Sequence, residues 1–144
     1  MIDVTGIHSF YGKAHILNDL SFSIGKGEVV SMLGRNGAGK TTTLKSIMQL
    51  VRPKIGSVKF NDLEIVGKAP HSVAKMGLGY VPEERRIFTD LTMLENLEVG
   101  RQPARDGISA WTLDILFELF PNLAERRGNR GKELSGGEQQ MLTI

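Results

Sequence analysis

The amino-acid sequence predicts an α/β protein whose front part is rich in strands and whose back part is helical. Residues 34–41 form a glycine-rich stretch between an apolar run typical of a buried strand and a run with helical spacing. The residues before this stretch alternate apolar and polar side chains, as half-buried strands do, whereas helical spacing prevails after residue 92. A chain of 144 residues is long enough for one domain, which would bury about two-thirds of its unfolded surface.

Several short segments of the front part are predicted strands, because they alternate apolar and polar residues or form short apolar runs. Before the glycine-rich stretch these segments are residues 2–11, 16–24 and 28–33. Glycines at 25 and 27 separate the last two, so we expect a hairpin with a three-residue loop there. A second hairpin is expected over residues 57–65, around an Asx turn at Asn61 and Asp62.

Four segments are predicted helices: residues 41–50, 70–76, 92–99 and 109–120. Gly77 fits the cap after the second helix, and the apolar run 78–81 is then predicted to be a buried strand that Pro82 stops. The last helix is predicted to be amphipathic, with Asp114 and Glu118 on its polar side. Its apolar side carries Trp111, Ile115, Leu116, Leu119 and Phe120.

The composition is that of an ordinary globular protein, with 40% hydrophobic and 24% charged residues. A net charge of +2 is too small to indicate a nucleic-acid partner. Without cysteine the chain has no disulfide, thiolate zinc site or cysteine nucleophile, which suits a reducing compartment. No signal-peptide pattern opens the sequence and no apolar run approaches about 18 residues, so we expect no membrane span in this chain. A local basic cluster is either a solvated surface or a functional patch; it comprises Arg126, Arg127, Arg130 and Lys132.

Residues 34–41 match the phosphate-binding pattern G-x-x-x-x-G-K-[ST] at every fixed position. A loop that wraps a polyphosphate must turn backbone N–H groups inward, which small residues permit. The helix that follows presents further N–H groups and the positive end of its dipole. We expect Lys40 to reach the β and γ oxygens of a nucleotide and the Thr41 hydroxyl to bind Mg²⁺. The alternative is a glycine-rich surface turn that only joins a strand to a helix.

A second motif lies near the end of the chain, where residues 134–140 read Leu-Ser-Gly-Gly-Glu-Gln-Gln. By itself, the spacing of Ser135 and Glu138 fits a capping box at a helix start. Combined with the phosphate loop, the stretch resembles the signature of the ATP-binding cassette (ABC) family. The chain as a whole is similar to the N-terminal part of an ABC transporter ATPase.

The resemblance implies an α/β P-loop NTPase fold of ABC type, with an antiparallel β subdomain, an incomplete parallel core sheet and a helical subdomain. Residues 1–81 would be the strand-rich nucleotide-binding part with the phosphate loop. Residues 82–144 would hold the glutamine-loop position, the helical subdomain and the signature. We therefore expect the chain to be the N-terminal part of one ABC ATPase domain.

The resemblance also assigns a site for ATP and Mg²⁺. Tyr11 falls where the family places an aromatic residue that stacks on adenine, although the strand alone would explain a tyrosine. Glu83 replaces the usual glutamine; a carboxylate can bind Mg²⁺ but cannot donate a hydrogen bond when ionised. The implied metal-binding residues are Thr41 and Glu83. The implied nucleotide-binding residues are Tyr11, Gly34, Arg35, Asn36, Gly37, Ala38, Gly39, Lys40, Thr41 and Thr42, and the signature residues that contact the nucleotide of a second subunit are Leu134, Ser135, Gly136, Gly137 and Glu138.

Residues 81–88, 91–97 and 117–123 closely resemble the subgroup for high-affinity branched-chain amino-acid uptake, in particular the second of its two paired ATPases. Related importers of urea or other amides share much of this pattern. The resemblance implies a peripheral ATPase on the cytoplasmic face of the cell membrane. Its partners would be a second ABC ATPase subunit, transmembrane permease subunits and, indirectly, a solute-binding protein.

The family's hydrolytic groups, an Asp-Glu strand and a switch histidine, follow the signature helix, so we expect neither before Ile144. We assign no catalytic residue within this chain and expect it alone to hydrolyse ATP poorly. A nucleotide-binding fragment without hydrolysis is the alternative function. The Asn-Lys-x-Asp motif of GTPases and the third glycine of a dinucleotide-binding loop are both absent from the sequence.

Overall fold

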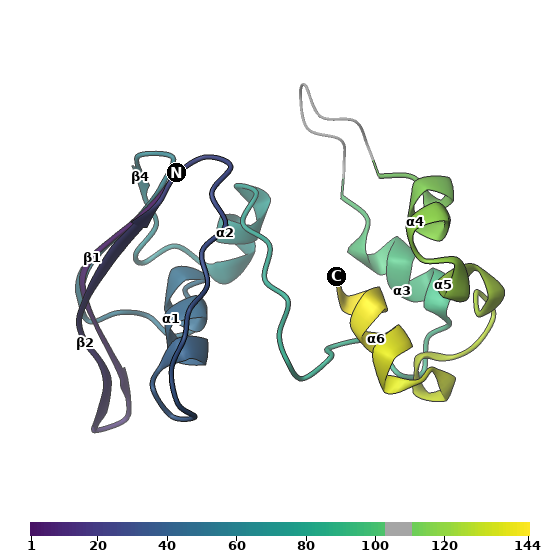
Figure 1. The fold of residues 1–144 in the computed structure, drawn as a ribbon, viewed down its shortest axis with the longest axis horizontal. Helices are drawn as coiled ribbons and strands as arrows, with labels where there is room; N and C mark the ends of the chain where they lie inside the picture. The colour runs from purple at the N-terminus through teal and green to yellow at the C-terminus, as the bar shows by residue number, and fades with distance from the viewer. Residues whose placement is uncertain (103–110) are drawn as a thin grey trace. The chain divides into compact units, whose positions relative to one another are not determined.

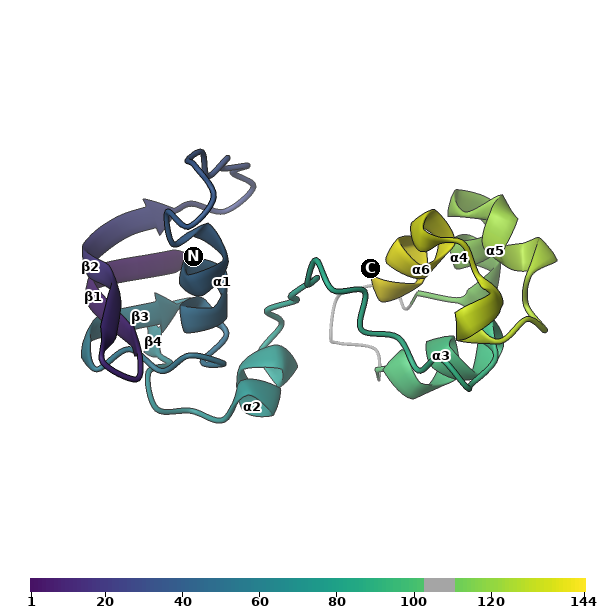
Figure 2. The same ribbon diagram turned by 90° about the horizontal axis from the view of Figure 1, so that it is seen from below.

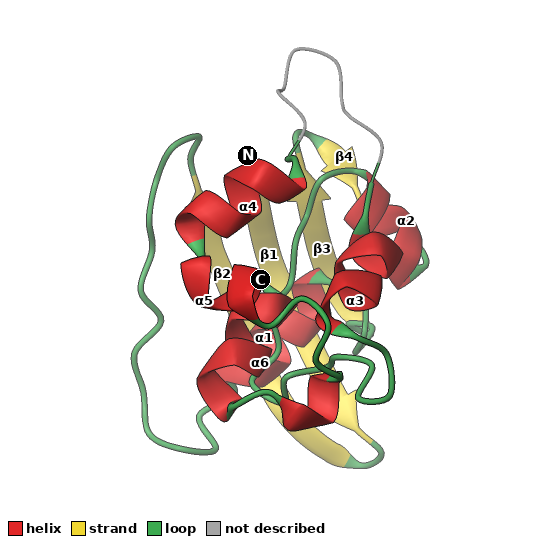
Figure 3. Ribbon diagram, turned by 90° about the vertical axis from the view of Figure 1, so that its right-hand side faces the viewer, coloured by secondary structure: helices red, strands yellow, loops and turns green. Residues whose placement is uncertain are grey.

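The computed structural model describes residues 1–102 and 111–144. These residues divide into two compact units, 1–80 and 81–144, which are described separately (Figure 1). All strands of the described residues, yellow in Figure 3, belong to the first unit. No helix among the described residues is long and apolar enough to cross a membrane.

The first unit contains a four-stranded sheet in which every neighbouring pair is antiparallel. Its strands lie in the order β2 (Ala14–Ile24), β1 (Ile2–Tyr11), β3 (Ile55–Phe60) and β4 (Leu63–Glu64), as Figure 2 shows. The strands predicted at 2–11 and 16–24 and the hairpin predicted over 57–65 are confirmed. Asn61 and Asp62 both have positive φ, 48° and 64°, which gives the two-residue turn that best matches strand twist.

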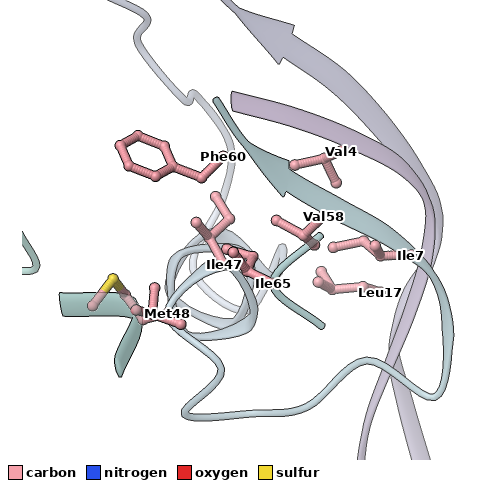
Figure 4. Packing of buried hydrophobic residues seen from close by; sticks show 9 residues of the cluster. Val4, Ile7, Leu17, Ile47, Met48, Val58, Phe60 and Ile65 are labelled. Atoms are coloured by element: carbon pink, nitrogen blue, oxygen red, sulfur yellow. The ribbon is translucent and has the colours of Figure 1, made fainter. Parts of the chain in front are cut away.

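Two helices pack against this sheet, α1 (Lys40–Ile47) and α2 (Pro70–Lys75). Figure 4 shows apolar side chains from β1, β3 and α1 converging between the sheet and the helix, among them Ile7, Val58 and Ile47. A buried hydrogen bond, 2.8 Å between the hydroxyls of Ser9 and Ser46, joins β1 to α1 inside this core. The helices predicted at 41–50 and 70–76 are confirmed, and the Gly77 N–H caps the second by donating to Ala74 O.

Two apolar runs predicted to be buried strands, 28–33 and 78–81, do not form strands, so those predictions are wrong. The expected hairpin between 16–24 and 28–33 is also not formed. A strand needs a hydrogen-bonded neighbour, and among the described residues none lies beside either run. Val29 and Leu33 are therefore 94% and 91% exposed, whereas Leu78 and Tyr80 pack against the first core as irregular chain.

The second unit is helical, as predicted for the back part. Its helices are α3 (Met93–Gly100), α4 (Leu113–Leu119), α5 (Pro121–Glu125), the 3₁₀ turn η1 (Gly131–Glu133) and α6 (Gly136–Thr143). Met93, Leu123 and Leu134 form its buried core. The helix predicted at 92–99 is confirmed, with Thr92 as its N-cap.

The helix predicted at 109–120 is shorter than expected. Residues 109 and 110 lie outside the described residues, and α4 begins only after Thr112, whose hydroxyl accepts a hydrogen bond from the Ile115 N–H. The predicted apolar side omitted Phe117 and included residues that are exposed. Phe117 and Phe120 pack against the core of this unit, whereas Ile115 and Leu119 are exposed.

Gly56 should be the most sensitive glycine of the sheet. A Cβ at this position would lie 2.3 Å from Gly6 O, at the irregular part of the β1–β3 pairing. Gly67 is a matched control, because its φ of +90° equals that of Gly56 (+94°) within a few degrees while nothing lies within 4 Å. We expect Gly67→Ala to lower the free energy of unfolding by about 1–2 kcal/mol from backbone strain, and Gly56→Ala by about 1–3 kcal/mol more from the clash. Urea denaturation measures both, and equal losses would contradict the packing described.

Candidate nucleotide-binding site

The phosphate loop predicted at 34–41 is an irregular, exposed turn that leads directly into α1. The Ala38 N–H donates to Arg35 O over 3.1 Å and closes the turn, so Arg35 and Asn36 protrude into solvent. Gly37 and Gly39 have φ of 85° and 91°, values that favour glycine. The loop therefore has the backbone conformation for which its glycines are needed.

Gly39 is where the loop packs against the sheet. A Cβ at this position would lie 2.9 Å from Leu17 Cδ2, and Leu17 is a buried residue of β2. The Gly39 carbonyl accepts hydrogen bonds from the Thr43 N–H at 2.8 Å and the Thr43 hydroxyl at 3.0 Å, which fixes the first turn of α1. The first N–H groups of a helix have no intrahelical acceptor, so those at the start of α1 are available to an anion.

Lys40 folds back over the loop. Its ammonium group donates to Gly34 O at 2.7 Å and Arg35 O at 2.9 Å. An ammonium has three donors and both of these acceptors are neutral, so an anionic oxygen would be a stronger partner. Thr41 is exposed, whereas Thr42 is buried, with only 7% of its surface exposed.

Tyr11 ends β1 and is 48% exposed. It pairs with Ala14, and two residues earlier on β1 Ser9 pairs with Leu17, the residue that contacts Gly39. This register places Tyr11 about 7 Å further along the strand, at the end of the hairpin that receives the phosphate loop. The first unit thus brings Tyr11 and the loop to the same end of the sheet, while adenine stacking stays a prediction.

The signature stretch forms the start of α6. Ser135 is the N-cap: its hydroxyl accepts from the Glu138 N–H at 3.3 Å, and its own N–H donates to the Glu138 carboxylate at 2.7 Å. Gly136 and Gly137 occupy the first turn, and Leu134 is buried in the core of the second unit. The Glu138 side chain is thus turned back onto its own helix, and its contact with nucleotide stays a prediction.

The capping hydrogen bonds lower the pKa of Glu138. The bond from the Ser135 N–H, followed by the Ser135 hydroxyl, holds the pKa of this carboxyl below its ordinary 4.5, and Arg126 at 3.6 Å acts in the same direction. The Arg126 contact was missed from the sequence, although Arg126 belongs to the basic cluster. Lys132 of the same cluster pairs with Asp90 at 3.3 Å, and Arg127 lies over the Phe117 ring. These partners favour the solvated-surface interpretation of the cluster.

The metal predictions concern two residues of different units. Glu83 is exposed in the segment between Pro82 and α3, whereas Thr41 belongs to residues 1–80. Their joint binding of Mg²⁺ therefore stays a prediction. Among the described residues, no group of three or more histidines, aspartates and glutamates is placed to hold a metal ion.

A phosphate-type loop leading into a helix packed on an antiparallel sheet, together with a helical unit that carries the signature, defines a P-loop protein of the cassette class. Residues 17–144 match the family model described as ABC transporter. The chain belongs to the ABC transporter family. The resemblance inferred from its motifs is thereby confirmed.

Curated relatives with similar sequences have several transport roles. The chain is 38% identical to the high-affinity branched-chain amino acid transport ATP-binding protein BraG of Pseudomonas aeruginosa. The match includes all of this chain and 62% of BraG. It is 33% identical to the probable branched-chain amino acid transport protein LivF of Archaeoglobus fulgidus, of which it covers 61%. It is 36% identical, over 93% of its length, to the lipopolysaccharide export protein LptB of Haemophilus influenzae, of which it covers 56%.

Solved structures confirm the fold class. The dimeric structure of MJ0796, a bacterial ABC transporter cassette, matches all of this chain with a TM-score of 0.79 and 25% identity, over 67% of that cassette. A bacterial Atm1-family ABC exporter with ATP bound matches 99% of the chain with a TM-score of 0.78 and 25% identity, over 26% of the exporter.

The capping box makes the start of α6 dependent on pH. Because the folded-state pKa of Glu138 lies below 4.5, its carboxylate stabilises the helix above that pH, and the contribution disappears as pH falls through the lowered pKa. A carboxyl NMR titration should give a midpoint below 4.5. Ser135→Ala should move this midpoint upward. Thr92→Ala, which disrupts the equivalent box at Glu95, should leave it unchanged. A wild-type midpoint at or above 4.5 would contradict the capping geometry.

Proposed function

We propose that this chain is the N-terminal part of the ATP-binding subunit of an ABC importer. The subunit would couple ATP binding and hydrolysis to the uptake of branched-chain amino acids or a related small polar solute. The observation that carries the proposal is the phosphate loop, in which the Lys40 ammonium lies over the loop backbone directly before the unpaired N–H groups of α1.

The geometry supports binding of a triphosphate. An incoming phosphate oxygen would take the Lys40 ammonium from the Gly34 and Arg35 carbonyls, because a hydrogen bond between two charged groups is stronger. The exposed Thr41 hydroxyl and the Glu83 carboxylate would hold Mg²⁺. Mg²⁺ would neutralise charge that develops on the phosphates. Tyr11 would stack on the adenine ring.

The signature would act on a nucleotide held by a second ATPase subunit. Ser135, Gly136 and Gly137 present a hydroxyl group and the N–H groups of a helix start, and such groups favour a phosphate. The similarity to a cassette of dimeric structure supports this arrangement. We also propose that residues 1–81 serve as the nucleotide-binding part, and residues 82–144 as the glutamine-loop position, helical subdomain and signature.

The chain spans about three-fifths of the two branched-chain relatives, 62% and 61%, so hydrolysis is proposed for the whole protein. The solute assignment rests on these two relatives and on the resemblance of residues 81–97, because LptB serves a different transport process. The proposed partners are permease subunits and, indirectly, a solute-binding protein. The proposed location is the cytoplasmic face of the membrane, with Glu83 and the residues after it facing the permease.

Lys40→Ala tests nucleotide binding directly. Loss of a charged hydrogen bond should weaken binding of Mg-ATP by about 10- to 100-fold. The Kd is measured by isothermal titration calorimetry on the 144-residue chain. Lys26→Ala, which removes the same charge from the exposed turn after β2, is the matched control and should leave the Kd unchanged. Equal affinity in the wild type and Lys40→Ala would contradict the assignment of the loop.

A further inference from the structure

A short ladder of backbone hydrogen bonds joins two distant segments of the second unit, residues 89–93 and 129–132. The Gly131 N–H donates to Leu91 O at 2.8 Å, and the Lys132 N–H donates to Thr89 O at 2.9 Å. In the opposite direction, the Met93 N–H donates to Asn129 O at 2.8 Å. The ladder therefore attaches the segment after Glu83 to the segment that enters the signature.

Gly131 is the position where this ladder is packed most tightly. A Cβ there would lie 2.8 Å from Phe88 O and 3.1 Å from Thr89 Cα, both backbone atoms, and 3.0 Å from Ile87 Cδ1. Its φ is outside the left-handed region, so glycine is needed here for space and not for backbone conformation. A side chain could be accommodated only if the two segments moved apart.

The same residue is bonded to the signature helix. The Gln139 side-chain amide of α6 donates to Gly131 O at 3.0 Å and to Leu134 O at 3.2 Å. The backbone of Gly131 thus holds the ladder through its N–H and the first turns of α6 through its carbonyl. Three residues separate Gly131 from Ser135, and they include the buried Leu134.

The other end of the ladder is held by Asn96 of α3. Its side-chain carbonyl accepts from the Phe88 N–H at 2.8 Å, and its amide donates to Phe88 O and Thr92 O, both at 2.9 Å. Residues 88–92 are thereby fixed to α3 on one side and to residues 129–132 on the other. A displacement of this segment would be carried through Gly131 to the start of α6.

We infer that Gly131 is a positioning residue for the signature: by lacking a side chain, it lets the ladder form and so holds Ser135, Gly136 and Gly137 in place. Gly131 itself touches no nucleotide in this account. The inference rests on the proposed function, which gives the signature its phosphate ligand. Its physical content, that Gly131 connects residues 88–92 to α6, is testable without any ligand.

The first experiment compares Gly131→Ala with Gly128→Ala, a control in which the new Cβ meets nothing within 4 Å. Amide hydrogen exchange of the 144-residue chain is followed by NMR. Gly131→Ala should accelerate exchange by about tenfold at the Met93 and Lys132 amides and also at Glu138 and Gln139 of α6. Gly128→Ala should leave all four rates unchanged. Acceleration confined to the ladder, or none at all, would overturn the inference.

A second variant decides the case if Gly131→Ala fails to fold. Asn96→Ala removes the side-chain bonds to residues 88–92 and should also accelerate exchange at Glu138 and Gln139; Asn122→Ala, an exposed asparagine of α5, is its control. When both single variants fold, Asn96→Ala should add no further acceleration at Glu138 in the Gly131→Ala background. Additive effects there, or unchanged α6 amides in Asn96→Ala, would overturn the inference.

The affinity for Mg-ATP separates this inference from the proposed function. That function assigns the phosphate contacts to residues 34–41 and a Mg²⁺ contact to Glu83, and neither Gly131 nor Gly128 is among these residues, so the Kd should be the same in the wild type, Gly131→Ala and Gly128→Ala. Absence of binding in the wild type would count against the proposed function and leave the exchange result standing. Normal Mg-ATP binding together with unchanged hydrogen exchange in α6 of Gly131→Ala would contradict the role of Gly131 and leave the proposed function standing.

Discussion

The first unit depends on the close approach of Gly39 to Leu17. Gly39 ends the phosphate loop and Leu17 belongs to the core of the sheet, so one contact fixes both the loop and the start of α1. The buried pair of Ser9 and Ser46 holds α1 to β1 further along the helix. A larger residue at position 39 would force the Leu17 side chain to shift, and the φ of 91° there disfavours any residue with a Cβ. The requirements of packing and of phosphate binding coincide at this glycine.

In the second unit, the signature residues also combine a structural role with the proposed role in binding. A capping box and a nucleotide-binding signature were competing interpretations of residues 134–140, but the geometry makes them compatible. Glu138 turns back to the helix end and accepts a hydrogen bond from the Ser135 N–H, which precedes the first-turn N–H groups of Gly136 and Gly137. The start of α6 also has contacts with residues distant in sequence, among them Arg126 with Glu138 and Gly131 with Gln139.

Sequence reasoning succeeded where structure is decided locally. The hairpin at Asn61 and Asp62, the α1 helix after Gly39 and the Thr92 cap follow from residues a few positions apart. It failed for residues 28–33 and 78–81, because an apolar run becomes a strand only beside a neighbour, which no local pattern reveals. The motifs located the phosphate loop and signature. They gave no sign of the Lys40 bonds to loop carbonyls or of the Gln139 bond to Gly131, since both depend on the folded backbone.

The central claim is that residues 34–41 hold a triphosphate through backbone N–H groups. It is tested most directly by titrating Mg-ATP into the ¹⁵N-labelled chain and following backbone amide resonances. We expect saturable shifts, with one common Kd, at the amides of Gly37, Gly39, Lys40 and Thr41, which line the loop and the start of α1. Saturable binding that leaves these four amides unshifted would contradict it.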